Sequence, residues 1–290
     1  MKTKRKGLLI FSAAIVLLAL ISVIFFPKIK LYMGNTRVYS YTGKDLQNVD
    51  DITLLAHSMT VEGSRNSVAG VKEAVRLGAN GVSVDLCFRP DGTPVMTDSY
   101  ESAASAPLIE DLFAAMTDEK YFDVRIFLNI VQLSDLSELN RLAVEYNMIS
   151  RLFLTGIDES HYGLITSDDT IIPFYLDYDV TAQDVSAMKD GTFTMPEVLG
   201  TYGAIGFVID RTDCSDKVIS AFDDYGIPLI VKNINSGNQL CDALISNART
   251  VYVSSIENSA NILNGWIVNM QERYESSVKS SLKELSTLNK

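Results

Sequence analysis

The sequence predicts a (β/α)8 TIM barrel preceded by one N-terminal transmembrane helix. Eight runs rich in Val, Ile, Leu, Phe and Tyr recur along the chain, and helical patterns separate most of them. An uncharged, mostly apolar run also occupies residues 7–26. An open doubly wound sheet is the alternative arrangement, and the count of eight strands favours the closed barrel.

The N-terminal region has the charge pattern of a membrane anchor. Residues 1–6 form a basic stub, and the apolar run at residues 7–26 is long enough to span a bilayer core as a helix. Basic residues in front of the run keep the N-terminus cytoplasmic. A cleaved signal peptide is the alternative, but Phe25-Phe26-Pro27-Lys28 is not a small-residue cleavage site. We therefore expect a single-pass cell-membrane protein whose barrel is extracytoplasmic.

The overall charge restricts the partners of the chain. Six of the 25 Lys and Arg residues, but none of the 36 Asp and Glu residues, lie in residues 1–30. Residues 31–290 therefore carry 19 basic and 36 acidic residues, a net charge of −17. This charge disfavours nucleic acid and anionic bilayer surfaces as partners. The three cysteines, Cys87, Cys214 and Cys241, give no disulfide framework and are expected to be small buried hydrophobes.

A regular alternation of strands and helices follows a linker at residues 27–50. Strands are expected at residues 52–57, 81–88, 125–131, 151–156, 171–178, 204–210, 228–233 and 250–255. Clear helical patterns occupy residues 68–79, 134–146, 215–225 and 237–246, and a long helix begins near residue 260. The barrel is expected to span residues 51–275, followed by a polar helical tail at residues 276–290.

The strand ends carry the candidate functional residues, because the working residues of a TIM barrel lie at the C-terminal ends of its strands. The residues at these ends are His57, Asp85, Asn129 or Val131, Asp158, Asp177 or Asp179, Asp210, Lys232 and Ser254. Alternation along the second strand predicts that Ser83, Asp85 and Cys87 face the barrel interior. His161 follows the fourth strand and is expected in a loop or helix.

Residues 54–98 contain a pattern that resembles the opening of the glycerophosphodiester phosphodiesterase family, which reads roughly AHRG…PENT…GAD…ELD…DG.PV..HD. The matching residues are Ala56-His57, Asn66, Gly78-Ala79-Asn80, Asp85, Asp91-Gly92 and Pro94-Val95. The resemblance implies a TIM-barrel phosphodiesterase in which two histidines act as general acid and base. It also implies that a Glu-x-Asp pair on the second strand and a Glu on the third bind Ca²⁺ or Mg²⁺.

Most residues that carry the family's chemistry are replaced in this chain. The replacements are Ser58 for Arg, Arg65 for Glu, Ser83 for Glu, Thr97 for His and Val131 for the third-strand Glu. His57 therefore remains as the single member of the catalytic pair, and Asp85 as the single metal ligand. Calcium or magnesium is expected only if the protein is active, because one carboxylate makes a poor site for either cation.

A buried carboxylate needs a partner, and the strand ends offer more than one for Asp85. A metal ion is one partner and Lys232 is another, although Lys232 is equally compatible with simple solvent exposure. Lys232 and Asp210 are the expected substrate-binding residues. Asp177, Asp179 and Asp210 could assemble a different site, although their spacing does not require one.

These observations predict a membrane-tethered, phosphodiesterase-like barrel that is catalytically impaired or inactive. It would act by binding a phosphodiester or polyol ligand, or a protein partner, at the strand ends. One alternative is an active phosphodiesterase with a rearranged site that hydrolyses glycerophosphodiesters or related lipid or wall phosphodiesters. The other alternative is a structural or assembly protein that depends on its anchor and its C-terminal helix.

Overall fold

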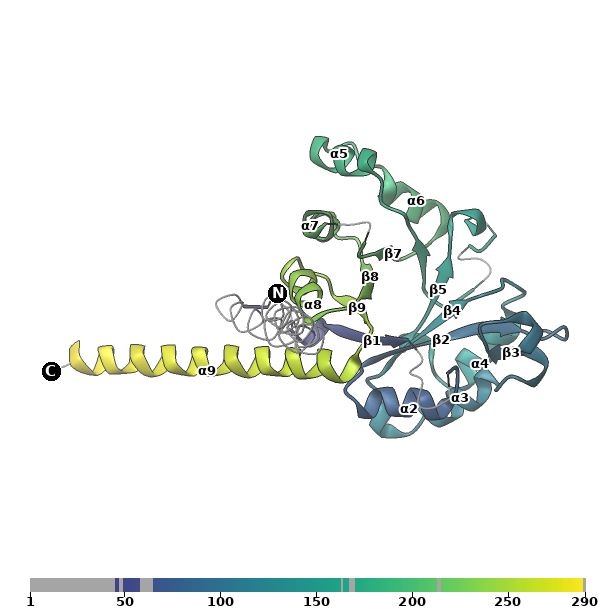
Figure 1. Cartoon of the computed structure of the whole chain (residues 1–290), viewed down its shortest axis with the longest axis horizontal. Coiled ribbons are helices and arrows are strands. Elements are labelled where there is room, and N and C mark those ends of the chain that lie inside the picture. Colours follow the sequence, from purple (N-terminus) through teal and green to yellow (C-terminus); the bar gives the residue numbers. More distant parts are fainter. Residues whose placement is uncertain are drawn as a thin grey trace, which may run out of the picture.

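The computed structural model describes residues 45–46, 49–57, 65–162, 164–166, 170–212 and 215–288, and in these ranges the chain forms a closed barrel (Figure 1). Eight parallel strands follow the order β1-β9-β8-β7-β6-β5-β4-β2, and the pairing of β1 with β2 closes the ring. The strands are β1 (Thr53–His57), β2 (Gly81–Phe88), β4 (Arg125–Ile130), β5 (Leu152–Ile157), β6 (Phe174–Asp177), β7 (Gly206–Asp210), β8 (Leu229–Ile234) and β9 (Thr250–Val253). A short strand, β3 (Pro94–Met96), pairs antiparallel with β2 outside the ring.

Helices surround the barrel (Figure 1). They are α2 (Val68–Arg76), α3 (Ile109–Met116), α4 (Ser137–Glu145), α5 (Ala182–Asp190), α6 (Met195–Tyr202), α7 (Asp216–Asp224), α8 (Gly237–Ile245) and α9 (Ile256–Leu288). Short 3-10 helices are η2 (Val49–Asp51), η3 (Tyr100–Ser105), η4 (Glu119–Tyr121), η5 (Ile149–Arg151) and η6 (Glu159–His161). The predicted barrel is confirmed, and each predicted strand agrees with the observed one to within three residues at either end.

The predicted membrane span at residues 7–26 lies outside the described residues. Among the helices that the structure describes, none is long and apolar enough to cross a membrane.

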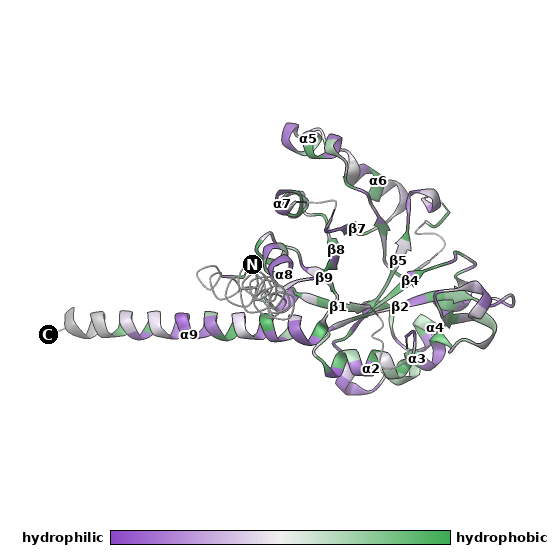
Figure 2. Ribbon diagram, in the orientation of Figure 1, coloured by the Kyte–Doolittle hydropathy of each residue, from purple (hydrophilic) through white to green (hydrophobic). Residues whose placement is uncertain are grey.

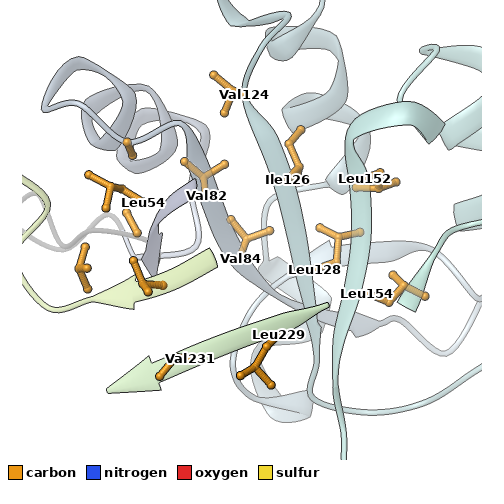
Figure 3. Packing of buried hydrophobic residues seen from close by; sticks show 14 of the residues in the cluster. Leu54, Val82, Val84, Val124, Ile126, Leu128, Leu152, Leu154, Leu229 and Val231 are labelled. Carbon is orange, nitrogen blue, oxygen red and sulfur yellow. The ribbon is translucent and has the colours of Figure 1, made fainter. Parts of the chain in front are cut away.

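The side chains of each strand alternate between two apolar layers. Val82 and Val84 of β2 pack outward into the main core between the barrel and its helices (Figure 3). Leu86 of the same strand belongs to this core as well. A separate inner cluster fills the barrel and consists of Leu55, Phe127, Tyr175, Val208 and Ile230. Ser83 and Asp85 lie on the inner face of β2, as predicted, and both are buried. Cys87, which was predicted to face the interior as well, packs instead with Val95, Ala103 and Ala106 in a separate cluster. The packed interior leaves the ends of the strands as the place for a polar site.

Two helices between β6 and β7 were not predicted from the sequence. No residue of α5 is fully buried, and its apolar residues Val185, Ala187 and Met188 pack only partly against the main core. Local capping adds to this packing: Thr181 and Asp184 form a capping box at the start of the helix, and Gly191 ends it with a left-handed backbone. The helix α6 likewise ends at Gly203 in the left-handed conformation.

Candidate functional site

The candidate site lies at the barrel mouth, which we define as the end of the barrel formed by the C-terminal ends of the strands. A pocket of about 310 Å³ opens there between β4 and β9. Its lining includes the polar residues Asn129, Thr155, Asp177, Lys232, Tyr252 and Ser254 beside Val208 and Val253. A pocket of this size is at the lower end of those that bind small molecules.

Asp85 is the most deeply buried carboxylate of the mouth, with 2% of its surface exposed. Its Oδ1 accepts a hydrogen bond from Asn129 Nδ2 at 2.8 Å, and its Oδ2 accepts one from Asn66 Nδ2 at 2.9 Å. The backbone N–H of Asp85 donates to Asn66 Oδ1 at 2.9 Å, which fixes the orientation of the Asn66 amide. Both carboxylate oxygens therefore face N–H donors, as the burial of a charged group requires.

Arg65 supplies the opposite charge. Its Nη2 lies 3.3 Å from Asp85 Oδ2, and its Nη1 lies 3.0 Å from Asp98 Oδ2. One planar guanidinium thus bridges two carboxylates that come from different segments of the chain. This Arg65 bridge, consisting of Arg65, Asp85 and Asp98, is the main charged feature on the β2 side of the mouth.

Two positive φ angles place the donors to Asp85. Asn66 adopts φ 53° just before α2, a left-handed conformation that Asn tolerates better than most residues, and its side chain is directed to Asp85. Gly156 has φ 78° where the pairing of β5 and β6 shifts register. A Cβ at Gly156 would lie 2.5 Å from Asn129 Oδ1 and 2.7 Å from Ile130 O. Glycine at this position therefore leaves the space that the Asn129 side chain occupies.

Lys232 pairs with Asp177 rather than with Asp85, which corrects the predicted partner. Lys232 Nζ lies 3.2 Å from Asp177 Oδ2, and the two side chains are 36% and 24% exposed. Asp177 Oδ1 is buried without a hydrogen-bond partner in the described part of the chain. The strand order gives the reason, since β8 is separated from β6 by β7 alone, whereas β9 and β1 stand between β8 and β2.

Asp210 lies at the end of β7 beside Lys232, its register partner on β8. Its Oδ1 accepts hydrogen bonds from the Thr212 hydroxyl at 2.7 Å and the Thr212 backbone N–H at 2.8 Å, and its Oδ2 accepts one from Asn233. Burial alone would raise the pKa of Asp210, but these hydrogen bonds together outweigh it and lower the pKa below 3.8. Asn233 reaches Asp210 from a left-handed conformation, φ 63°, where β8 shifts register against β9.

Two buried hydroxyls line the centre of the barrel below the mouth. The Ser83 and Thr155 hydroxyls are buried, and the Tyr252 phenol is the group that interacts with both of them among the residues that the structure describes. Burial raises the pKa of Tyr252 well above its ordinary value, so the phenol stays protonated as a neutral donor. The floor of the pocket is therefore polar and uncharged.

Other predicted site residues are distributed around the rim. His57 ends β1 opposite Ser83, and its side chain lies outside what the structure describes. Thr97, at the family's second histidine position, donates its backbone N–H to Asp85 O at 3.1 Å. Val131 is 42% exposed at the end of β4. His161 lies in η6 with Nδ1 2.7 Å from Asp158 Oδ1, which confirms its expected place outside the strands.

These residues do not fit a divalent cation. Ca²⁺ and Mg²⁺ require several oxygen ligands with free lone pairs, whereas both oxygens of Asp85 accept hydrogen bonds and one also contacts the Arg65 guanidinium. A fixed positive charge at this distance repels a second cation. Within the described ranges, no group of three or more His, Cys, Asp or Glu side chains is arranged to hold a metal ion.

The sequence did not reveal the roles of Arg65 and Asp98. In the sequence Arg65 stands out only as a departure from the family pattern, although an Arg in place of a Glu beside a buried carboxylate reverses the local charge. Asp98 follows Thr97 in a stretch that otherwise matched the family. The presence of Arg65 at a position where the family has Glu was the signal that could have predicted an ion pair with Asp85 or Asp98.

The chain was compared with known proteins. No family model matches the sequence, and no curated protein sequence matches it significantly. Solved structures do match. A glycerophosphodiester phosphodiesterase from Parabacteroides distasonis has a TM-score of 0.57 at 12% identity, over 74% of this chain and 98% of that one. A second, from Agrobacterium tumefaciens, has a TM-score of 0.55 at 12% identity, over 73% of this chain and 98% of that one.

A phosphodiesterase from Oleispira antarctica, solved in complex with the product sn-glycerol-3-phosphate, has a TM-score of 0.55 at 13% identity, over 78% of this chain and 99% of that one. All three matches cover nearly the whole of the other chain. The closed barrel of eight parallel strands in this chain therefore has the fold of the glycerophosphodiester phosphodiesterases.

Proposed function

We propose that this protein is a phosphodiesterase-like barrel that binds a small polar ligand at its mouth without hydrolysing a phosphodiester. The observation that carries the proposal is the Arg65 bridge. Arg65 lies 3.3 Å from Asp85 and 3.0 Å from Asp98, where the family resemblance implies carboxylates that hold a divalent cation. The chain supplies its own cation to the retained carboxylate.

An arginine does not replace the chemistry of a divalent cation. The guanidinium carries a single delocalised charge, stays protonated and has no open coordination position for a phosphate oxygen or a water. In the Arg65 bridge its charge is already neutralised by Asp85 and Asp98. The bridge thus stabilises the fold of the mouth, and it does not provide the charge stabilisation that phosphodiester cleavage needs.

Proton transfer is also incomplete. His57 is the retained histidine, while Thr97 stands at the second position and is 6% exposed. Losing one general acid or base typically lowers the rate by about 10²–10⁴. An active site rebuilt on the other strand-end carboxylates is disfavoured, because Asp177 pairs with Lys232 and Asp210 is held by Thr212 and Asn233.

The pocket chemistry favours a polyol over a phosphodiester as the ligand. Asp177 Oδ1 is a buried acceptor without a partner, and hydroxyl groups of a polyol would donate to it. The Lys232 ammonium is already paired with the same carboxylate. An added phosphate would meet Asp177 and Asp210 at the rim and would be repelled by both, whereas an uncharged ligand would not.

The N-terminal apolar run supports a location of the ligand-binding barrel outside the cell membrane. Residues 7–26 would anchor the chain in the cell membrane, with the basic residues 1–6 in the cytoplasm and the barrel outside. The ligand would then come from the extracytoplasmic space or from the membrane surface. Protease added to intact cells should remove the barrel and leave the N-terminal stub protected.

Hydrolysis assays of the purified full chain test the proposal. Glycerophosphocholine incubated with calcium or magnesium should give no more product with the unmodified protein than with the His57→Ala variant. Turnover that rises with calcium and disappears in His57→Ala would contradict it.

Binding assays test the ligand. The melting temperature should rise with glycerol or myo-inositol more than with an equal concentration of sn-glycerol 3-phosphate. The rise should be lost in the Asp177→Asn variant, because the amide presents a donor where the ligand needs an acceptor. An equal response in the variant would place the ligand elsewhere.

A further inference from the structure

We propose that residues 27–44 pack antiparallel along the part of α9 that extends beyond the barrel, so that the two segments form a stalk between the barrel and the apolar run at residues 7–26. The stalk is separate from the barrel mouth and independent of the ligand proposal.

The first observation is an apolar face on α9, consisting of Ile267, Met270, Tyr274, Val278 and Leu282. Spacings of three and four residues put these side chains on one side of the helix. Ile267 and Met270 are partly buried against the main core. The face then continues past the barrel, where Tyr274, Val278 and Leu282 are 73%, 40% and 61% exposed.

Figure 1 shows this part of α9 extending well away from the barrel. Hydrophobic positions recur among hydrophilic ones along it (Figure 2). An apolar stripe that starts in the core and runs on into solvent indicates a partner along its length.

The second observation is where the described chain meets α9. The Leu46 backbone N–H points at Met270 Sδ at 3.4 Å, and the Leu46 side chain is 6% exposed. Asp45 pairs with Arg273 at 2.8 Å. Leu46 contacts Met270, and the residue before it, Asp45, contacts Arg273, which is closer to the C-terminal end of α9. The chain that precedes Asp45 is therefore directed towards that end of the helix. Residue 44 would enter beside Tyr274, at the root of the exposed part of the apolar face.

A groove of about 920 Å³ lies at this point. Asp45, Met270, Arg273 and Tyr274 are among the residues that line it. The groove therefore starts at the first described residue and follows α9 in the direction in which the preceding chain must leave.

The length of the segment is sufficient. The helix rises by about 18 Å from Met270 to Leu282 at about 1.5 Å per residue. Residues 27–44 could extend to roughly 60 Å at about 3.3 Å per residue. The segment can follow the apolar face either as a helix or as an extended chain.

The composition of the segment also matches. Its apolar residues include Leu31, Tyr32, Met33, Val38, Tyr39 and Tyr41. Its charged residues are all basic: Lys28, Lys30, Arg37 and Lys44. The exposed part of α9 carries three acidic residues, Glu272, Glu275 and Glu284, and three basic ones, Arg273, Lys279 and Lys283. Its charges therefore balance, and the match between the two segments rests on their apolar residues. A second copy of α9 is a weaker occupant, because the entering chain at Asp45 already covers the start of the face.

Disulfide trapping in the full chain, purified in detergent, tests the pairing. Val278→Cys is combined with one further cysteine substitution at Val38, Tyr39 or Tyr41. The matched control is Ser276→Cys, because Ser276 is two positions away and faces the opposite side of the helix. We expect an intramolecular disulfide with Val278→Cys in at least one combination and none with Ser276→Cys, since a disulfide needs Cα atoms within about 7 Å.

The absence of every intramolecular disulfide, or equal trapping by both α9 positions, would overturn the proposal. A disulfide-linked dimer formed by Val278→Cys alone would assign the face to a second copy and would overturn it too. Hydrogen exchange gives a second measurement: Val278→Asp should speed amide exchange in residues 31–41, whereas Ser276→Asp should not. Unchanged exchange in Val278→Asp would count against the stalk.

Discussion

Arg65 and Asp85 form an ion pair at the barrel mouth, with Nη2 of the arginine 3.3 Å from Oδ2 of the aspartate. The same guanidinium contacts Asp98, so the buried carboxylate obtains its counter-charge from the polypeptide. The pair lies where the family resemblance implies a bound divalent cation. The fold of the protein thus matches that of phosphodiesterases, whereas the charged residues at its mouth pair with one another.

Gly156→Ala should destabilise the protein by crowding Asn129. The added Cβ would lie 2.5 Å from Asn129 Oδ1 and also carries the strain of φ 78°. Strain and overpacking together should lower the free energy of unfolding by about 2–4 kcal/mol. Urea denaturation of the two proteins measures the difference.

Gly191→Ala is the matched control for this change. Gly191 has φ 68°, but among the described residues other than its own chain neighbours no atom lies within 4 Å of the position of its Cβ. The control therefore carries the conformational strain alone and should cost about 1 kcal/mol. Equal losses in the two variants would mean that Asn129 is not held by the space at Gly156.

Lys232 should be energetically coupled to Asp177 and not to Asp85. A double-mutant cycle of Lys232→Met with Asp177→Asn should give a coupling free energy of about 1 kcal/mol or less, because the Lys232 side chain is 36% exposed and solvent screens the pair. The cycle of Lys232→Met with Asp85→Asn should be additive. Chemical denaturation of the six proteins gives both values, and coupling to Asp85 alone would show that the lysine reaches across the mouth in solution.

Asp210 should contribute to stability in a pH-dependent way. Its folded pKa lies below 3.8, so the ionised form is stabilised by folding. This contribution is fully present above pH 3.8 and is lost as the pH falls through the lower folded pKa. The difference in unfolding free energy between the unmodified protein and Asp210→Asn should therefore shrink on acidification.

Thr212→Val, which removes a hydroxyl donor to Asp210, should retain part of this pH dependence. A difference between the unmodified protein and Asp210→Asn that stays constant from neutral pH to below the folded pKa would contradict the assignment. Denaturation series at several pH values check both variants.

The eight strands could be predicted from the sequence because each is a run of β-branched and aromatic residues bounded by helix ends and turns. The helix α5 could not, since its few apolar side chains are only partly buried and a capping box of Thr181 and Asp184 sets its start. Local hydrogen bonds of this kind leave no periodic apolar pattern. The fold was therefore predictable where burial determines it.

The location of the candidate site could be predicted from the sequence, but the ion pairs between its residues could not. Because they lie at the ends of predicted strands, four residues were expected to lie together at the barrel mouth: Asp85, Asp177, Asp210 and Lys232. The partner of Lys232 depends on the order of strands around the ring and on the reach of its side chain, which the sequence does not specify. The Arg65 bridge depends on the conformation of the segment before α2, and a loop conformation is not encoded by periodicity.

Calcium titration tests the central claim most directly, and melting temperature is the readout. The unmodified protein should melt at the same temperature with and without millimolar calcium, because the Arg65 guanidinium already pairs with both Asp85 and Asp98. Arg65→Glu should gain a calcium-dependent rise in melting temperature, since a third carboxylate would replace the guanidinium. Arg76→Glu makes the same charge change on the exposed face of α2 and should show no rise. A melting temperature of the unmodified protein that increases with calcium would contradict the account.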